Sequence, residues 1–395
     1  MNIQSKIKLN RKKVLILGPI SDFGGREVEV QLISKALIEE YDIDLISTLP
    51  FTYKSVALLS SANYSWNSLQ GLLYKNSIIL RISSLLTKFF NRRKEVPESF
   101  INNVLTYQLV DLDKKMKSYL EQAIASCDIV LFCGEFTSKW LIESFEICQK
   151  YHKPILVRTT GQIKKIPESL FENLHIQHHI LVHSVGNFKR LKTMSNFNQS
   201  IIDQTSIVEP ALLTIPTKLN NKTISYGYIG RFSKEKGIED LLKFMDGSHR
   251  KLVIAGSGPL HKEVESHCKQ NENFTNLGEL SLEELHLFFN KIDVLIISSF
   301  EEAGPLVGIE AMAAGKLIVS TRVGAMPDRL KDVRNSFWFD IKKEQSFLDV
   351  LEKIEGMDRN TLHELKEENR KHYIKKYSFN VIASQYQEQI KNLIN

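Results

Sequence analysis

The amino-acid sequence predicts an α/β protein, and three observations lead to this class. Short apolar runs recur along the chain, several are bounded by Gly or Pro, and each is followed by a longer amphipathic stretch. Continuous apolar strands that alternate with helices are typical of parallel sheets covered on both faces. The expected strands are Val14–Leu17, Asp44–Ser47, Ile129–Phe132, Ile155–Val157, Ile180–His183, Tyr226–Ile229, Leu252–Ala255, Val294–Ile297 and Leu317–Ser320.

The composition is that of a soluble globular protein. Of the 395 residues, 43% are hydrophobic and 25% charged, which excludes a disordered, fibrous or membrane-spanning class. The net charge of +6 is too small to predict nucleic-acid binding. The four cysteines show no C-x-x-C pair, so no disulfide framework or zinc site is expected. The basic N-terminus leads into an apolar run that ends at Gly18-Pro19, too short for a secretory signal, and we expect a cytoplasmic protein.

The strands form two series, which predicts two domains. The first series ends near residue 212, and the polar stretch 214–223 is the expected linker. We expect an N-terminal domain over residues 1–212, a second domain over 213–376 and a closing helix over 377–395. This division suits a chain long enough for about two to three domains.

An insertion interrupts the first series at residues 55–118, where no buried strand is expected. Its apolar residues recur at the spacing of one helix face, and no acidic residue occurs between Tyr74 and Lys94. Two interpretations stay open: this face packs on the domain core, or it lies in the interface of an anionic membrane. The apolar residues are Ile78, Ile79, Ile82, Leu85, Leu86, Phe89 and Phe90, and the accompanying basic residues are Arg81, Lys88, Arg92, Arg93 and Lys94.

An anion site is predicted directly after the expected strand Val294–Ile297. A short loop leads into a helix expected over Pro305–Ala314, with Pro at its first position and Gly after its end. The amides of Leu306, Val307 and Gly308 would have no intrahelical partner there, and the helix dipole favours an anion such as phosphate.

Two carboxylates flank this turn. Glu302 precedes the helix and Glu310 lies inside it, with its side chain tilted back toward the helix start. A carboxylate beside a phosphate would be repelled, so each is suited to accept hydrogen bonds from ligand hydroxyls. The alternative is an acidic helix start that the dipole stabilises without any ligand.

Cations and glycines lie at other expected strand ends. Arg231 and Lys236 follow the strand Tyr226–Ile229, and ligands of open parallel sheets bind at this edge. Alone, both residues would be ordinary surface charges. In the first half, Gly24-Gly25 precedes an expected helix over Arg26–Glu39 and allows a ligand to approach the backbone.

Taken in order, these segments resemble the retaining glycosyltransferases of GT-B fold, family 4, also called glycosyltransferases group 1. The pair Glu302 and Glu310 matches the E-x7-E signature of that family, within E-A-G-P-L-V-G-I-E-A-M-A-A-G-K-L-I-V-S-T. Further similar segments are Y-I-G-R-F-S-K-E-K-G-I-E-D-L-L from Tyr228, L-V-I-A-G-S-G-P-L from Leu252, L-G-E-L-S-L-E-E-L from Leu277 and G-G-R-E-V-E-V from Gly24.

The resemblance implies two Rossmann-like domains with a central cleft, the first for the acceptor and the second for a nucleotide-diphosphate sugar. By the same resemblance, Arg231 and Lys236 hold the donor diphosphate, Glu302 contacts the donor sugar and Glu310 the ribose. The backbone of Gly304, Pro305, Leu306 and Val307 lines the sugar–phosphate turn, and Gly24 and Gly25 close on the donor from the other domain. Catalysis is assigned to Glu302, Arg231 and Lys236, without a metal or other cofactor.

The sequence also departs from the family pattern. A glycine and then an aromatic residue are expected after the first Glu, but Ala303 and Gly304 stand there. The histidine that many members carry is absent from the strand ends at 131–135 and 158–161, where Glu135 or Arg158 are the candidate substitutes.

The implied activity is transfer of a sugar to a hydroxyl of a glycan or lipid-linked acceptor, in bacterial surface polysaccharide or glycoconjugate synthesis. The implied partners are the nucleotide sugar and the acceptor, with no nucleic acid. Lipid-linked acceptors would place the protein at the inner face of the cell membrane through peripheral contact. Two alternatives remain at this stage: a sugar-nucleotide epimerase of GT-B type, and a non-catalytic glycan-binding partner of another transferase.

Overall fold

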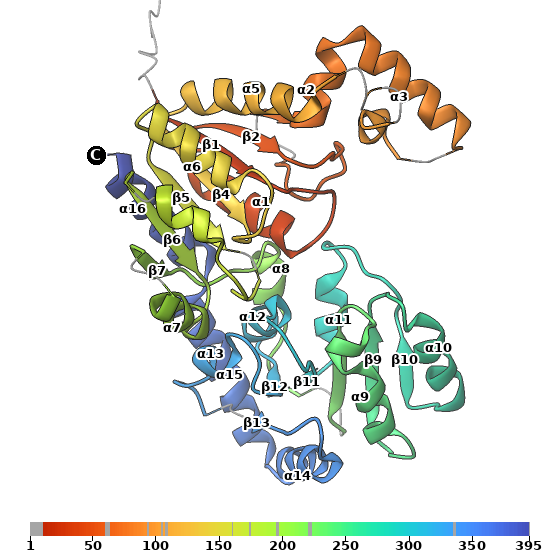
Figure 1. Ribbon diagram of the computed structural model, residues 1–395. Helices are drawn as coiled ribbons and strands as arrows, with labels where there is room; N and C mark the ends of the chain where they lie inside the picture. The colour runs from red at the N-terminus through yellow and green to blue at the C-terminus, as the bar shows by residue number, and fades with distance from the viewer. Residues whose placement is uncertain are drawn as a thin grey trace, which may run out of the picture. The chain divides into compact units, whose positions relative to one another are not determined.

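The computed structural model describes residues 11–59, 64–92, 95–103, 106, 110–159, 161–173, 175–194, 197–219, 223–334 and 337–394. The chain forms two compact units, each with one parallel sheet (Figure 1). The first unit contains the residues up to Val182, Asn187–Ile202 and the chain from Ala383 onward, and the second contains His183–Gly186 and Asp203–Ile382.

The first sheet has seven parallel strands in the order β3-β2-β1-β4-β5-β6-β7. The chain starts in the middle and winds toward both edges, the topology of a doubly wound fold. The five strands expected in this half are confirmed. The strands are β1 (Lys13–Gly18), β2 (Asp42–Ser47), β3 (Ser65–Ser68), β4 (Ile129–Gly134), β5 (Ile155–Thr159), β6 (His178–Val182) and β7 (Gln199–Ile201).

No buried strand is expected between residues 55 and 118, and β3, which lies there, is a partly exposed edge strand that was not predicted. β3 has the sequence Ser-Trp-Asn-Ser, begins with two exposed residues and pairs with β2 at the edge of the sheet. An edge strand is only partly covered, so it needs no continuous apolar run and leaves no such signal in the sequence.

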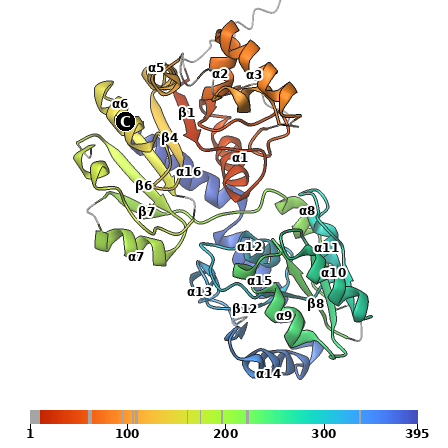
Figure 2. The same ribbon diagram turned by 45° about the vertical axis from the view of Figure 1, so that its right-hand side comes forward.

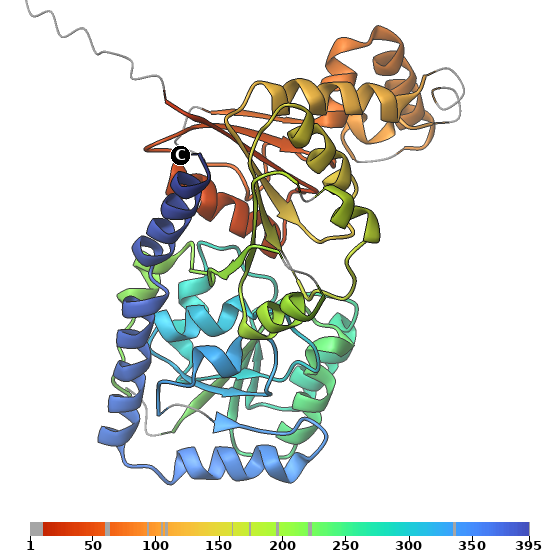
Figure 3. The same cartoon turned by 60° about the vertical axis from the view of Figure 1, so that its left-hand side comes forward.

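Helices cover both faces of the first sheet. Leu15, Leu17, Val130 and Phe132 point into a core that α2, α5 and α6 complete. In the insertion, α2 packs on α5 and on α3, and α3 lies at the border of this unit (Figures 2 and 3). The helices are α1 (Gly25–Leu37), α2 (Leu69–Asn76), α3 (Ile78–Phe90), η1 (Pro97–Phe100), α5 (Leu112–Ala125), α6 (Leu141–Lys150), η2 (Glu168–Asn173), α7 (Val185–Met194) and α16 (Phe379–Ile394).

The second sheet has six parallel strands in the order β10-β9-β8-β11-β12-β13. The four strands expected in this half are confirmed, and the short edge strands β10 and β13 were not predicted. The strands are β8 (Ser225–Ile229), β9 (Lys251–Ala255), β10 (Phe274–Asn276), β11 (Val294–Ile297), β12 (Leu317–Ser320) and β13 (Phe337–Trp338).

Alternate residues of these strands face two separate cores. Tyr226, Ile254 and Ile296 face α9, α10 and α14, whereas Ala255 and Leu295 face α8, α11 and α12. The helices are α8 (Glu209–Leu213), η3 (Lys234–Lys236), α9 (Ile238–Met245), α10 (His261–Gln270), α11 (Leu285–Lys291), α12 (Leu306–Ala313), α13 (Met326–Arg329), α14 (Glu344–Glu355) and α15 (Arg359–Lys376).

The division of the chain falls before Asp203, whereas the sequence places a domain boundary after residue 212. Asp203 belongs to the second unit because its carboxylate pairs with the buried Arg329 at 2.6 Å. The hydroxyl of Thr205 similarly lies 3.1 Å from that of Tyr373. Residues 220–222 of the expected linker lie outside the described residues.

Candidate active site

The loop between β11 and α12 forms the centre of the candidate site in the second unit. Pro305 is the N-cap of α12, Ala314 is its C-cap, and Gly315 follows with φ of +61°. A left-handed residue after a helix end favours glycine. The predicted strand, loop and helix are therefore confirmed, with the helix one residue shorter at each end than expected.

Two backbone amides are available at the start of α12. Within the described part of the chain, the N–H groups of Leu306 and Val307 donate to no backbone acceptor. The prediction of a third available amide is wrong, because Gly308 donates to the carbonyl of Pro305 at 3.1 Å. The remaining two amides, with the positive end of the helix dipole, suit an anion.

Lys236 and Glu302 meet beside this turn as an ion pair, with side chains 25% and 18% exposed. The loop that carries Lys236 is fixed to the loop after β11 by two hydrogen bonds. The Ser298 hydroxyl donates to the Lys236 carbonyl at 2.9 Å, and the Phe300 amide donates to the Glu235 carbonyl at 2.9 Å. The structure therefore brings together two residues that the sequence places 66 positions apart.

Arg231 lies at the carboxyl end of β8 with an exposed side chain. Its carbonyl accepts a hydrogen bond from the Tyr228 hydroxyl at 3.0 Å, which fixes the backbone while the guanidinium stays exposed to solvent. The neighbouring turn Gly256-Ser257-Gly258-Pro259 packs against this loop. A Cβ on Gly256 would come within 1.9 Å of the Gly230 carbonyl oxygen, so this glycine permits backbone packing.

Glu310 is buried inside the second unit, with 3% of its surface exposed. Burial raises the pKa of its carboxyl to about 7, although a hydrogen bond with Ser206 lowers it. A ligand hydroxyl that donates to this carboxylate would favour the charged form further. Its assigned contact with ribose stays a prediction.

Arg329 is a site residue that the sequence analysis missed. Its fully buried guanidinium donates to the Pro305 carbonyl at 2.7 Å and to the Asp203 carboxylate at 2.6 Å. It thereby holds Pro305, the N-cap of α12. Nothing in the local sequence indicates this role, because Arg329 and Asp203 are 126 positions apart.

The departure from the family pattern at Gly304 has a steric explanation. A Cβ on Gly304 would come within 2.7 Å of the His183 ring carbon Cδ2 and 3.2 Å of Arg329 Nη2. The imidazole and the guanidinium thus occupy the space in which a larger side chain would lie. His183 lies at the end of the expected strand Ile180–His183, and no role for it is predicted from the sequence.

In the first unit, Arg158 is a structural residue, and its interpretation as a substitute for the missing histidine is wrong. It is 1% exposed, pairs with Glu29 at 2.9 Å and donates to the Ile202 carbonyl at 2.6 Å. Tyr386 of α16 donates to the same Glu29 at 2.6 Å. A buried guanidinium that forms an ion pair within the first unit is not available to a substrate.

The other first-unit candidates are Gly24, Gly25 and Glu135. Gly24 is the N-cap of α1, and a Cβ there would come within 2.5 Å of the Glu27 carboxylate. A Cβ on Gly25 would meet no other atom within 4 Å, so the space beside this residue is open. Glu135 is exposed after β4. The roles of all three toward the donor or acceptor stay predictions.

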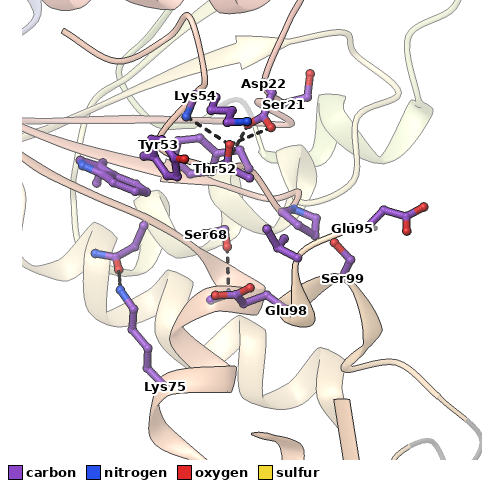
Figure 4. Close-up of a pocket in the computed structure, with 16 residues that line it drawn as sticks. Ser21, Asp22, Thr52, Tyr53, Lys54, Ser68, Lys75, Glu95, Glu98 and Ser99 are labelled. Carbon is purple, nitrogen blue, oxygen red and sulfur yellow. Dashed lines mark hydrogen bonds between the residues drawn. The ribbon is translucent and has the colours of Figure 1, made fainter. Parts of the chain in front are cut away.

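The first unit also contains a pocket of about 780 Å³. Phe51 and Trp66 form an edge-to-face pair in its wall with ring centroids 5.3 Å apart. Asp22 accepts hydrogen bonds from the Thr52 amide at 2.6 Å and hydroxyl at 2.9 Å, and lies across the pocket from Glu98 (Figure 4). Aromatic faces combined with hydrogen-bonding groups suit a polar organic ligand such as a sugar.

Comparison with known proteins finds a family match in the second half of the chain. Residues 215–372, which carry β8, β11, α12 and the loops between them, match the family model described as glycosyl transferases group 1. This segment is therefore similar to the group 1 glycosyltransferases.

Two curated glycosyltransferases show the extent of this similarity. The chain is 33% identical over 126 residues to an uncharacterized glycosyltransferase of Methanocaldococcus jannaschii, covering 30% of this chain and 32% of that protein. It is 27% identical over 183 residues to lipopolysaccharide 1,2-N-acetylglucosaminetransferase of Salmonella typhimurium, covering 42% of this chain and 47% of that protein. The chain thus matches about a third to a half of the length of these relatives.

Solved glycosyltransferase structures match the fold along most of the chain. The lipopolysaccharide outer core galactosyltransferase WaaB aligns with a TM-score of 0.67 at 15% identity, over 96% of this chain and 99% of that one. Anabaena Alr3699/HepE in complex with UDP and glucose aligns with a TM-score of 0.69 at 14% identity, over 96% and 100%. The fold of this chain is therefore GT-B, with two Rossmann-like domains, as the sequence resemblance implies.

Two further findings concern the described residues only. No group of His, Cys, Asp and Glu among them has the arrangement of a metal site. None of the described helices combines the length and apolar character needed to cross a bilayer.

Proposed function

We propose that the chain is a retaining glycosyltransferase that moves a sugar from a nucleotide-diphosphate donor to a hydroxyl of a glycan or lipid-linked acceptor. The observation that carries this proposal is the ion pair of Lys236 with Glu302 in the loop before α12, whose first two amides are available, within a segment that matches the group 1 glycosyl transferase model. The named relative in lipopolysaccharide synthesis and the structural neighbour that holds UDP support the same assignment. The proposed setting is bacterial surface polysaccharide or glycoconjugate synthesis.

The chemistry follows from where negative charge develops. As the bond between the anomeric carbon and the phosphate oxygen breaks, the leaving diphosphate gains charge, and Lys236, Arg231 and the two amides stabilise it. The acceptor oxygen attacks on the same face of the sugar, and its proton passes to a donor phosphate oxygen. Preorganised donors of this kind contribute about 3–4 kcal/mol each to the transition state.

The carboxylates have separate proposed roles. Glu302 already contacts Lys236 and would accept hydrogen bonds from the donor sugar, while Glu310 would accept them from the ribose. The backbone of Gly304 and Pro305 would lie beside the part of the donor where the sugar joins the diphosphate. Because the protein supplies these cations and amides itself, we propose that transfer needs no metal.

The pocket in the first unit is the proposed site of the acceptor. The apolar face of a sugar ring would stack on Trp66, whose side chain is 39% exposed, while Glu98 and Asp22 would accept hydrogen bonds from its hydroxyls. Gly24, the N-cap of α1, and Gly25, its first residue, would contact the donor.

The test is an incubation of the purified protein with nucleotide sugars, with and without an oligosaccharide acceptor, followed by NMR of the product. The proposal predicts a new glycosidic bond with the anomeric configuration of the donor, at a rate that EDTA leaves unchanged. Donor isomerised without acceptor would instead indicate an epimerase. No turnover of any donor, with glycan binding retained, would indicate a non-catalytic partner.

A further inference from the structure

Helix α3 presents its apolar face to solvent. Seven of its eight large apolar side chains are between 46% and 77% exposed. The interpretation that this face packs on the domain core is therefore wrong. These side chains, together called the α3 face, are Ile78, Ile79, Ile82, Leu85, Leu86, Phe89 and Phe90.

The side of α3 that packs on the protein is mostly small and polar. Leu80, Ser83 and Ser84 are buried, and the Ser83 hydroxyl donates to the Asn103 side chain at 3.1 Å. The hydroxyl of Thr87 donates back to the Ser83 carbonyl at 2.8 Å. The helix is thus held by its polar side, which is the reverse of how an amphipathic helix packs in a globular core.

The charges on α3 itself have one sign. Arg81 and Lys88 lie on one flank of the helix, Arg92 follows its end, and no acidic residue occurs between Tyr74 and Lys94. Arg81 is fixed by a hydrogen bond of 2.7 Å to the Lys75 carbonyl. Arg93 and Lys94 continue the basic run but lie outside the described residues.

We propose that the α3 face docks on an anionic lipid bilayer. An apolar stripe of Ile, Leu and Phe that runs the whole helix, flanked by Arg and Lys, is the pattern of helices that lie flat in the headgroup region. The apolar side chains enter the acyl boundary, while the basic side chains reach the lipid phosphates. A second copy of this chain fits less well, because a two-fold contact between two such faces would bring like charges together.

The test is flotation of the full-length protein with phosphatidylcholine vesicles, with and without phosphatidylglycerol, at low and high NaCl. We expect binding to the anionic vesicles at low salt and much weaker binding at high salt or to neutral vesicles, because salt screens the charge attraction. The paired change Phe89→Gln with Phe90→Gln should weaken binding at least about tenfold. Lys88→Glu with Arg92→Glu should do the same.

Matched control variants distinguish this docking from nonspecific binding to vesicles and from the proposed function. Leu287→Gln removes a 48% exposed apolar side chain from α11, and Lys262→Glu reverses an exposed charge on α10; neither should change vesicle binding. Donor binding measured by thermal shift should be unchanged in all four variants. Three results would each overturn the proposal. Wild type could fail to bind anionic vesicles at low salt, or the α3 variants could bind them as well as wild type does. The third result is that wild type forms a dimer that dissociates only in the α3 variants.

Discussion

Lys236 and Glu302 form an ion pair between the loop after β8 and the loop after β11, although 66 positions separate them in the sequence. The pair places a cation and a carboxylate beside the start of α12, where Leu306 and Val307 have available amides. A donor diphosphate would take Lys236 as its partner, which leaves Glu302 to accept hydrogen bonds from sugar hydroxyls. This exchange of partners is the centre of the proposed donor site.

Lys236→Ala should lower kcat by about a hundredfold or more, because a charged donor to the leaving diphosphate is lost. Arg231→Ala should have an effect of the same direction. Neither change should alter the fold, since Arg231 is exposed and Lys236 only partly buried. The checks are steady-state transfer rates and the melting temperature. Lys234→Ala, an exposed neighbour, is the control, and wild-type turnover in Lys236→Ala would refute the assignment.

Glu310→Gln should stabilise the protein at pH 8 and much less at pH 5. The folded pKa of about 7 exceeds the ordinary value of 4.5, so the folded chain retains a proton that the unfolded chain releases between these values. Stability therefore falls as pH rises through this window, by about 3 kcal/mol at most. Urea unfolding at both pH values measures it, with exposed Glu283→Gln as the control. An effect of equal size at both pH values would show that ionisation is not the cause.

Gly304→Ala should destabilise the second unit by about 1–3 kcal/mol, because its Cβ would overlap the His183 ring. The double change with His183→Ala should recover part of that loss, since the ring is then absent. Thermal unfolding of the two single variants and the double variant gives the coupling energy. Simple additivity of the two single effects would contradict the steric account.

Arg329→Met should cost about 3–5 kcal/mol, because the Asp203 carboxylate loses its buried partner. Adding Asp203→Leu should recover much of that stability without recovering donor affinity, because the Pro305 carbonyl still lacks its donor. Urea unfolding and isothermal titration with a nucleoside diphosphate check the two halves separately. Full recovery of donor affinity in the double variant would show that Arg329 does not position the start of α12.

The sequence allowed the central strands and the α12 turn to be predicted because continuous apolar runs and a Pro-to-Gly helix are local signals. The edge strands β3 and β10 gave no such signal, because an edge strand is only partly covered. Arg329 and His183 were missed as site residues because tertiary packing brings them to Pro305 and Gly304. The spacing of apolar residues also predicted the apolar face of α3. It could not predict whether this face is buried or exposed, because that depends on what packs against the helix.

The most direct test of the account is a thermal-shift titration with nucleoside diphosphates and their sugar conjugates, comparing wild type, Lys236→Ala and Lys234→Ala. Ligand that binds the folded chain raises its melting temperature by mass action. The account predicts that at least one diphosphate stabilises wild type and Lys234→Ala but not Lys236→Ala. Two results would contradict a donor site at Lys236 and the start of α12. One is equal stabilisation of all three proteins, and the other is that no diphosphate raises the melting temperature of wild type.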